Sequence, residues 1–143
     1  MLVVAAPLWT VNGSDGGGLR ISDLLAVALW VTGVFFEAVG DWQLLRFKRD
    51  PANKGQIMTR GLWSITRHPN YFGEALLWWG IFLAALPVRF GWLAVLSPLT
   101  IDFLLVRVSG IPMLEKKYEG NPQFEAYRRR TNAFFPGPPK PAK

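Results

Sequence analysis

The sequence predicts an all-α, integral membrane helical bundle. Half of the 143 residues are hydrophobic and 18% are charged, whereas soluble domains carry about a quarter charged residues. Long apolar stretches alternate with short basic segments, and the mean hydropathy is +0.18. Seven Trp and ten Phe residues suit the aromatic belts found at membrane surfaces. We expect three full transmembrane helices, a short N-terminal apolar helix and a cytoplasmic amphipathic C-terminal helix.

Three apolar stretches account for the predicted spans. A helix needs about 20 mostly apolar residues to cross a bilayer. The first stretch is apolar through its centre and polar on one side near its end, and the third is interrupted at Pro98. The second and third are separated by a tight turn, which implies an antiparallel pair. The predicted spans are residues 24–45, 69–88 and 92–108.

The two ends of the chain have a different character. Residues 2–11 are apolar but too short to span a bilayer alone. Near the other end, Tyr118, Phe124 and Tyr127 recur at roughly helical spacing among basic residues, which predicts an amphipathic helix at the membrane surface. The arginines at 128–130 either form its polar face or hold a ligand phosphate. We expect one membrane domain, residues 1–136, followed by a disordered Pro-rich tail, residues 137–143.

The distribution of positive charge predicts the topology. Residues 46–67 hold six basic residues and the segment from Arg107 onward holds eight, while Arg20 and Arg89 make up the remaining two. Cytoplasmic loops of membrane proteins carry such an excess. The 46–67 loop and the tail are therefore expected to be cytoplasmic, in a bacterial inner membrane.

The same composition argues against several kinds of partner. The net charge is +6, but the basic residues lie between apolar stretches, so we expect the lipid bilayer as a partner and no nucleic acid. The absence of Cys excludes disulfides and thiolate metal sites. A single His without carboxylates at ligand spacing predicts no metal site.

The boundary between the basic loop and the second span carries the most chemistry. Pro69 suits the first turn of a helix, and the free N–H groups of that turn attract anions. Arg60 and Arg67 lie close by in the sequence. Two interpretations stay open from the residues alone: a phosphate or carboxylate site, or a helix start with arginines reaching the membrane surface.

Acidic side chains enter the apolar spans. Asn70 and Glu74 are four apart and share a helix face, and Gly73 beside them leaves room for a ligand or another helix. An intramembrane carboxylate is costly, so Glu74 either serves a function or pairs with an Arg or Lys. Glu37 and Asp41 share a face of the first span, and we expect it to meet the Asn70/Glu74 face.

Asp102 is a further acidic candidate, but a weaker one. It lies nearer the middle or outer part of its span. An interhelical hydrogen bond would explain this carboxyl at least as well as a functional role does.

Two motifs carry a family resemblance. The segments Arg60-Gly61-Leu62-Trp63 and Arg67 to Glu74 resemble the steroid 5-alpha-reductase C-terminal family. More closely, the chain is similar to its bacterial membrane branch, DUF1295, from about Glu37 through Pro136, including the tail patterns at 114–118 and 124–127. The resemblance implies an all-helical membrane protein. It also implies reduction of a carbon–carbon double bond conjugated to a carbonyl, with NADPH bound from the cytoplasmic side.

The resemblance assigns roles to the positions that match. Asn70 and Glu74 fall in the Asn-Tyr-Phe-Gly-Glu motif, whose Asn and Glu contact the cofactor. Asp41 matches an acid that lines the same site, and Lys48 falls where a phosphate contact is implied. The implied cofactor-binding residues, with the neighbours included, are Asp41, Lys48, Arg60, Arg67, His68, Asn70, Tyr71 and Glu74.

The resemblance leaves the catalytic residues unidentified. The reductases place their substrate pocket and catalytic acid/Tyr pair in N-terminal helices for which this chain has no room. Tyr71 and Tyr118 do not qualify for those roles by residue type alone. Three alternatives follow: a truncated product, a partner (a second copy or a missing N-terminal half) that supplies the remainder, or a non-catalytic remnant.

A second family shares part of the signature. Isoprenylcysteine carboxyl methyltransferase-like and phospholipid methyltransferases carry Arg-His-Pro-x-Tyr-x-Gly, bind S-adenosylmethionine and usually have paired glutamates before the tail helix. The corresponding residues here, 109–112, contain no acid. We therefore favour an NADPH-dependent membrane oxidoreductase acting on a hydrophobic, lipid- or steroid-like substrate. The alternatives are an S-adenosylmethionine-dependent methyltransferase and a non-catalytic fragment.

Overall fold

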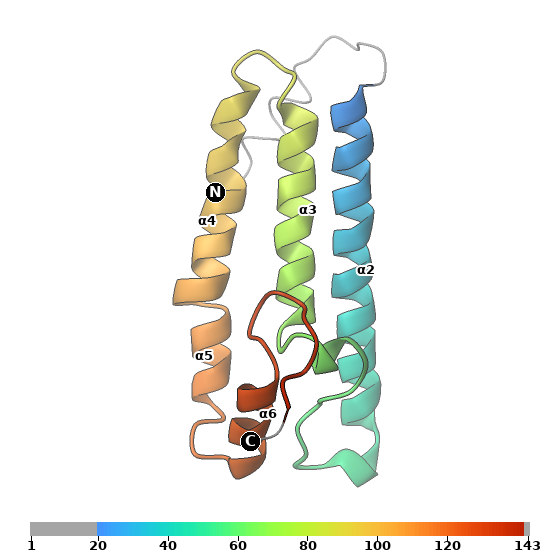
Figure 1. Ribbon diagram of the computed structural model, residues 1–143, viewed down its shortest axis with the longest axis vertical. Helices are drawn as coiled ribbons and strands as arrows, with labels where there is room; N and C mark the ends of the chain where they lie inside the picture. The colour runs from blue at the N-terminus through green and yellow to red at the C-terminus, as the bar shows by residue number, and fades with distance from the viewer. Residues whose placement is uncertain (1–19, 142–143) are drawn as a thin grey trace.

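The computed structural model describes residues 20–141, and its helix labels follow Figure 1. The predicted N-terminal helix, residues 2–11, lies outside the described residues. The described part contains no β-strand, which confirms the all-α class. The α-helices are α2 (Ile21–Arg49), α3 (Pro69–Ala85), α4 (Leu96–Phe103), α5 (Ile111–Lys116) and α6 (Pro122–Arg130). Shorter 3-10 turns cover Pro51–Asn53, Gly61–Ser64 and Gly91–Val95, and a π-helix covers Leu104–Val108.

Two helices have the length and composition of a membrane span. They are α2, with 29 residues, and the helical run Gly91–Lys116, with 26 residues. The third predicted span, α3, has 17 residues. At 1.5 Å per residue it is about 26 Å long, slightly shorter than a hydrocarbon core of about 30 Å. These two helices agree with the predicted membrane location, and a third full crossing stays a prediction.

Pro98 does not interrupt its helix as expected. It lies in the first turn of α4, directly after the 3-10 turn that ends at Val95. A proline in the first turn of an α-helix removes none of the i to i−4 hydrogen bonds within that α-helix. The helical run therefore continues past the predicted end at residue 108, through the π-helix into α5.

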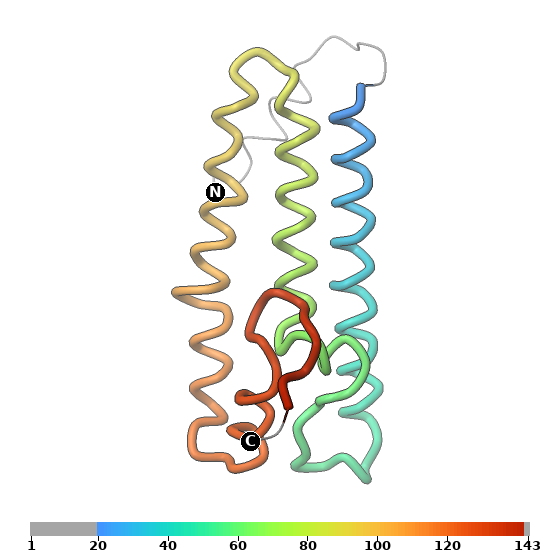
Figure 2. The backbone as a smooth tube through the Cα atoms, in the orientation of Figure 1, coloured from blue at the N-terminus to red at the C-terminus, as the bar shows by residue number. Residues whose placement is uncertain are grey.

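Glycines let α2 and α3 pack closely side by side (Figure 2). A Cβ atom added at Gly73 would lie 2.6 Å from both the backbone N of Glu37 and the backbone O of Gly33. One added at Gly80 would lie 2.8 Å from the carbonyl O of Ala26. A Cβ atom added at Gly40 would lie 3.4 Å from the backbone N of Asn70, and the charges of Glu37 and Glu74 interact, so the expected meeting of the Glu37/Asp41 face with the Asn70/Glu74 face is confirmed.

The C-terminal segment turns back onto the bundle after α6, as Figure 1 shows. The backbone N–H of Arg67 donates to the carbonyl of Asn132 over 2.9 Å, and that of Gly137 donates to Ile65 over 2.9 Å. The predicted tail helix is split into α5 and α6 by a turn. Its aromatic residues Phe124 and Tyr127 are buried against the protein. Disorder of residues 137–143 stays a prediction.

We predict that Gly73→Ala destabilises the protein. The added methyl group would overlap backbone atoms of α2, which cannot move aside like a flexible side chain. Overpacking of this kind costs about 1–3 kcal/mol, so the thermal unfolding temperature in detergent should fall. Ala28→Leu, on the exposed face of α2, is the control and should leave the temperature nearly unchanged. Equal behaviour of the two variants would contradict the close packing.

Candidate functional site

A buried ion pair fixes the start of α3. The Arg67 Nε donates to Glu115 Oε1 over 2.8 Å, and Nη2 donates to Oε2 over 3.1 Å. Nη1 donates to the backbone carbonyls of Arg128 and Thr131. The two paired side chains are 8% and 12% exposed. Every guanidinium nitrogen of Arg67 thus has a partner within the protein, and the arginine does not reach outward to the membrane surface.

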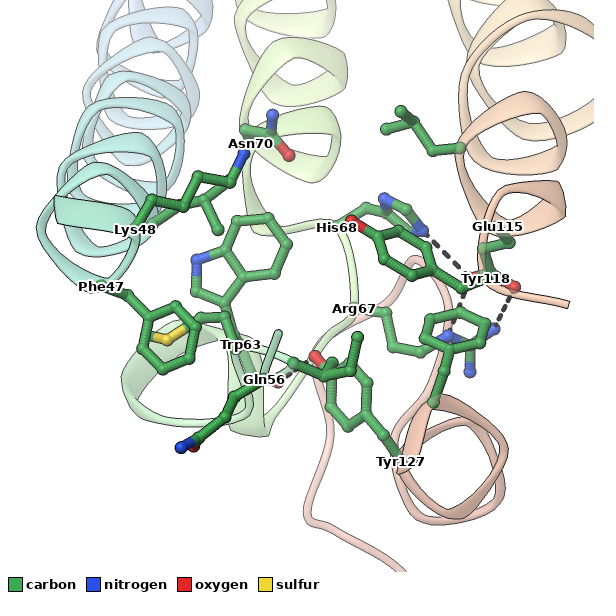
Figure 3. Close-up of a pocket in the computed structure, with 15 residues that line it drawn as sticks. Phe47, Lys48, Gln56, Trp63, Arg67, His68, Asn70, Glu115, Tyr118 and Tyr127 are labelled. Atoms are coloured by element: carbon green, nitrogen blue, oxygen red, sulfur yellow. Dashed lines mark hydrogen bonds and ion pairs between the residues drawn. The ribbon is translucent and has the colours of Figure 1, made fainter. Parts of the chain in front are cut away.

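His68 joins the same network. Its Nε2 lies 3.0 Å from Glu115 Oε1, and its ring stacks on Tyr71 with 5.4 Å between the centroids. His68 is also the residue that precedes the first turn of α3. Glu115 therefore holds two consecutive side chains at this helix start, and it ties α3 to α5 (Figure 3).

A cavity of about 180 Å³ lies beside this network (Figure 3). Its walls come from five places in the chain: the end of α2, the loop before α3, the first turn of α3, α5 with the turn that follows it, and α6. Most of the lining is aromatic or aliphatic, with a few polar groups among it. The lining residues are Leu44, Phe47, Lys48, Gln56, Ile57, Met58, Trp63, Arg67, His68, Asn70, Leu114, Glu115, Tyr118, Phe124 and Tyr127.

Asn70 presents an unpaired acceptor at this cavity. Its Oδ1 is buried and has no hydrogen-bond partner among the described residues. A buried acceptor without a donor costs about 1–3 kcal/mol, so native proteins rarely leave one in this condition. Asn70 therefore combines an unsatisfied acceptor with a position in the cavity wall.

Trp63 and Tyr127 form another part of the cavity wall. The Tyr127 hydroxyl donates to the carbonyl of Trp63, and the Trp63 indole N–H donates to the carbonyl of Gly40 over 3.0 Å. Burial raises the pKa of the Tyr127 phenol above its ordinary value, so this hydroxyl stays a donor at physiological pH. The chain of contacts links α6 to α2 through the 3-10 turn at Gly61–Ser64.

The structure distributes the predicted site residues over three places. Lys48, Arg67, His68 and Asn70 line the cavity. A second group lies along the α2–α3 contact. There the charge of Glu37 interacts with those of Asp41 and Glu74. Tyr71 also lies near Asp41 and Glu74. Arg60 lines a separate hollow beside Arg46 and Asp50. Whether each residue contacts a cofactor stays a prediction.

Several lining residues belong to motifs of the family resemblance but were not predicted to lie at the site. Glu115 precedes two lysines in a polar segment, which is typical of a solvated helix face. Trp63 was noted only as part of a motif. Phe124 and Tyr127 showed helical spacing, but that spacing does not reveal which surface the helix covers.

A family model now bears on this geometry. The model described as a protein of unknown function (DUF1295) matches residues 1–131. The chain belongs to this family. The resemblance drawn from the Arg60 and Arg67 motifs is thereby confirmed.

Two relatives show similarity over shorter stretches. The probable O-methyltransferase ustE of Ustilaginoidea virens is 31% identical over 87 residues, which cover 59% of this chain and 31% of the relative. The steroid 5-alpha-reductase DET2 of Arabidopsis thaliana is 33% identical over 67 residues, which cover 46% of this chain and 25% of the relative. The matches therefore span less than a third of each relative. No solved structure matches the chain.

We predict that Glu115→Ala lowers stability strongly. The change leaves the buried Arg67 charge without its carboxylate, and breaking a buried pair in this way costs about 3–5 kcal/mol. Thermal unfolding in detergent measures the loss. Glu119→Ala removes an exposed carboxylate four residues away and should change little. A small effect of Glu115→Ala would show that water reaches Arg67.

Proposed function

We propose that this chain is an NADPH-dependent membrane oxidoreductase, or the cofactor-binding C-terminal half of one. The reaction is reduction of a C=C bond conjugated to a carbonyl in a lipid- or steroid-like substrate. The observation that carries the proposal is the unpaired Asn70 Oδ1 in the wall of an aromatic cavity that also includes Lys48. The similarity to the steroid 5-alpha-reductase DET2 supports it.

The lining suits part of a dinucleotide. Pockets that enclose a whole drug-sized ligand measure about 300–1,000 Å³, so a cavity of about 180 Å³ takes one ring system. Trp63 and Tyr127 offer flat apolar surfaces to such a ring. An amide or amino N–H on the ring would donate to Asn70 Oδ1, and the Lys48 ammonium would attract a phosphate.

The residues of this chain bind and orient. NADPH, when bound, supplies a hydride for the β carbon of the substrate. Asn70 fixes the ring by its hydrogen bond, while the Arg67–Glu115 pair keeps the helix that bears Asn70 in place. The acid that polarises the substrate carbonyl is not among the residues assigned here, and a second copy or an N-terminal half would contribute it.

A methyltransferase is the second candidate. The match to the probable O-methyltransferase ustE covers 59% of this chain, against 46% for the reductase DET2. S-adenosylmethionine also contains an adenine whose amino group can donate to Asn70. The acid-free segment at residues 109–112 argues for the reductase. A non-catalytic membrane fragment is the third alternative.

Titration of the purified protein with each cofactor separates these functions. Trp63 lies in the cavity wall, so bound NADPH should accept energy from tryptophan and emit near its own wavelength. Calorimetry measures S-adenosylmethionine in parallel. Binding of S-adenosylmethionine alone would overturn the reductase, and binding of neither cofactor would favour the non-catalytic fragment.

We predict that Asn70→Ala weakens NADPH binding about tenfold. The change removes the acceptor for a buried ligand donor, and a hydrogen bond of this kind contributes about 0.5–1.5 kcal/mol, with more when a donor is left unpaired. Thr32→Val, whose hydroxyl bonds only to Ala28 of its own helix in the described structure, is the control. Unchanged affinity for Asn70→Ala would remove the main support for the proposal.

We also predict that Glu74→Ala weakens NADPH binding more than Asp102→Ala does. Glu74 lies one helix turn from Asn70 on the same face of α3, whereas Asp102 lies on α4 and bonds to Trp79. Titration of both variants under the same conditions gives the ratio of dissociation constants. Equal effects would count against the placement of the cofactor.

A further inference from the structure

The hollow that contains Arg60 lies between the end of α2 and the loop that follows this helix (Figure 1). Its volume is about 360 Å³. Arg46 of α2 also lines it, so two arginines from different elements face one space. Phe47 and Met58 line both this hollow and the proposed cofactor cavity, and the rest of the two linings is separate.

The two arginines of this hollow lack an acidic partner. Neither Arg46 nor Arg60 forms an ion pair within residues 20–141. Asp50 is the acid among the lining residues that the structure describes. Its Oδ1 accepts the backbone N–H of Ala52 over 2.9 Å. The lining therefore carries two positive charges and one negative charge, and its excess of positive charge favours an anion.

Trp42 positions one of the two guanidinium groups. The Cζ of Arg46 lies 5.6 Å from the centroid of the Trp42 ring, which is a cation–π contact between residues one helical turn apart. This contact uses no guanidinium N–H as a hydrogen-bond donor. The Trp42 side chain is 56% exposed, and exposed tryptophans at the ends of membrane helices are typical of the headgroup level of a bilayer.

The length of α2 agrees with this level. The helix has 29 residues and is about 43 Å long at 1.5 Å per residue, whereas the hydrocarbon core of a bilayer measures about 30 Å. Arg20 precedes the helix, and Arg46 lies about 39 Å further along its axis. A bilayer with its headgroups measures about 40–45 Å, so the two arginines fit its two opposite headgroup layers.

An apolar face of α2 leads from the hollow toward the middle of the helix. Phe35 is 51% exposed and Val31 is 53% exposed. They precede Trp42 by two and three helical turns, so the three side chains share one face. A lipid whose headgroup enters the hollow can therefore lay an acyl chain along this face.

We propose that this hollow binds the headgroup of a negatively charged membrane phospholipid. The guanidinium N–H groups of Arg46 and Arg60 donate to the phosphate oxygens, for which the planar guanidinium is well shaped. Trp42 keeps Arg46 at the level of the headgroup, and an acyl chain follows the exposed face of α2. The proposal rests on the predicted membrane location and is independent of the proposed cofactor.

Native mass spectrometry of the detergent-purified protein with dioleoyl phosphatidylglycerol tests the proposal. Dioleoyl phosphatidylcholine has the same phosphate and acyl chains but no net charge, and it should bind about fivefold or more weakly. Inorganic phosphate in excess should not displace the lipid, because it lacks the acyl chains. Equal binding of the two lipids, or displacement of the lipid by inorganic phosphate, would overturn the proposal.

Substitutions that remove one charge each locate the bound lipid. Arg46→Gln and Arg60→Gln should each weaken phosphatidylglycerol binding about tenfold, because hydrogen bonds between charged groups are the stronger ones. Arg49→Gln is the matched control: this exposed arginine lies on α2 outside the lining, and its loss should leave binding nearly unchanged. Equal losses in all three variants would indicate general attraction by surface charge and would contradict the site.

A variant with the opposite expected effect completes the test. Asp50→Asn removes the negative charge from the lining, and an asparagine side chain can still accept the Ala52 N–H. Phosphatidylglycerol should therefore bind more tightly, and weaker binding would count against a phosphate in this hollow. Gel filtration and thermal unfolding establish that each variant is folded. NADPH titration of Arg46→Gln reports separately on the cofactor cavity, so the two proposals can fail independently.

Discussion

The buried guanidinium of Arg67 is the interaction on which the end of the bundle that holds α5, α6 and the start of α3 depends. It binds Glu115 of α5 and the carbonyls of Arg128 and Thr131 at the end of α6. A buried charge is tolerated only when its partners are complete. The helix α5 and the end of α6 are therefore held at a fixed distance from the start of α3. These bonds also position the part of the cavity wall that carries Asn70.

Helix α3 is connected with both unpaired buried oxygens of the described structure. It lies between α2 and α4 in the bundle (Figure 2), and it bears Asn70 at its start and Trp79 two to three turns further on. The first side chain has an unpaired oxygen of its own, and the second holds Asp102 with its unpaired oxygen in place. These are the two buried side-chain oxygens or nitrogens without a partner in the described structure. One helix thus bears Asn70 and, through Trp79, holds Asp102 in place.

The features of the fold that depend on local patterns of residues were predicted from the sequence. Apolar length and the Pro69 helix start placed α2 and α3, and the four-residue spacing of Asn70 and Glu74 placed them on one face. Glu115 and Tyr127 were not predicted as parts of the site, because their partners lie far away in the sequence. The spacing of residues along one helix does not reveal contacts between distant segments. Pro98 misled the interpretation, since a proline breaks a helix only beyond its first turn.

The return of the C-terminal segment onto the bundle determines the order in which parts of the chain can fold during synthesis. The carbonyls that bind the Arg67 guanidinium belong to residues 61 and 64 positions later in the chain. The glycine-mediated pair of α2 and α3 can assemble as soon as both helices leave the ribosome, since chains fold from their N-terminal parts during synthesis. Until the last turn of α6 emerges, Arg67 must remain hydrated. Closure of the cavity is therefore a late folding event, and a nascent chain cannot present a complete ligand site.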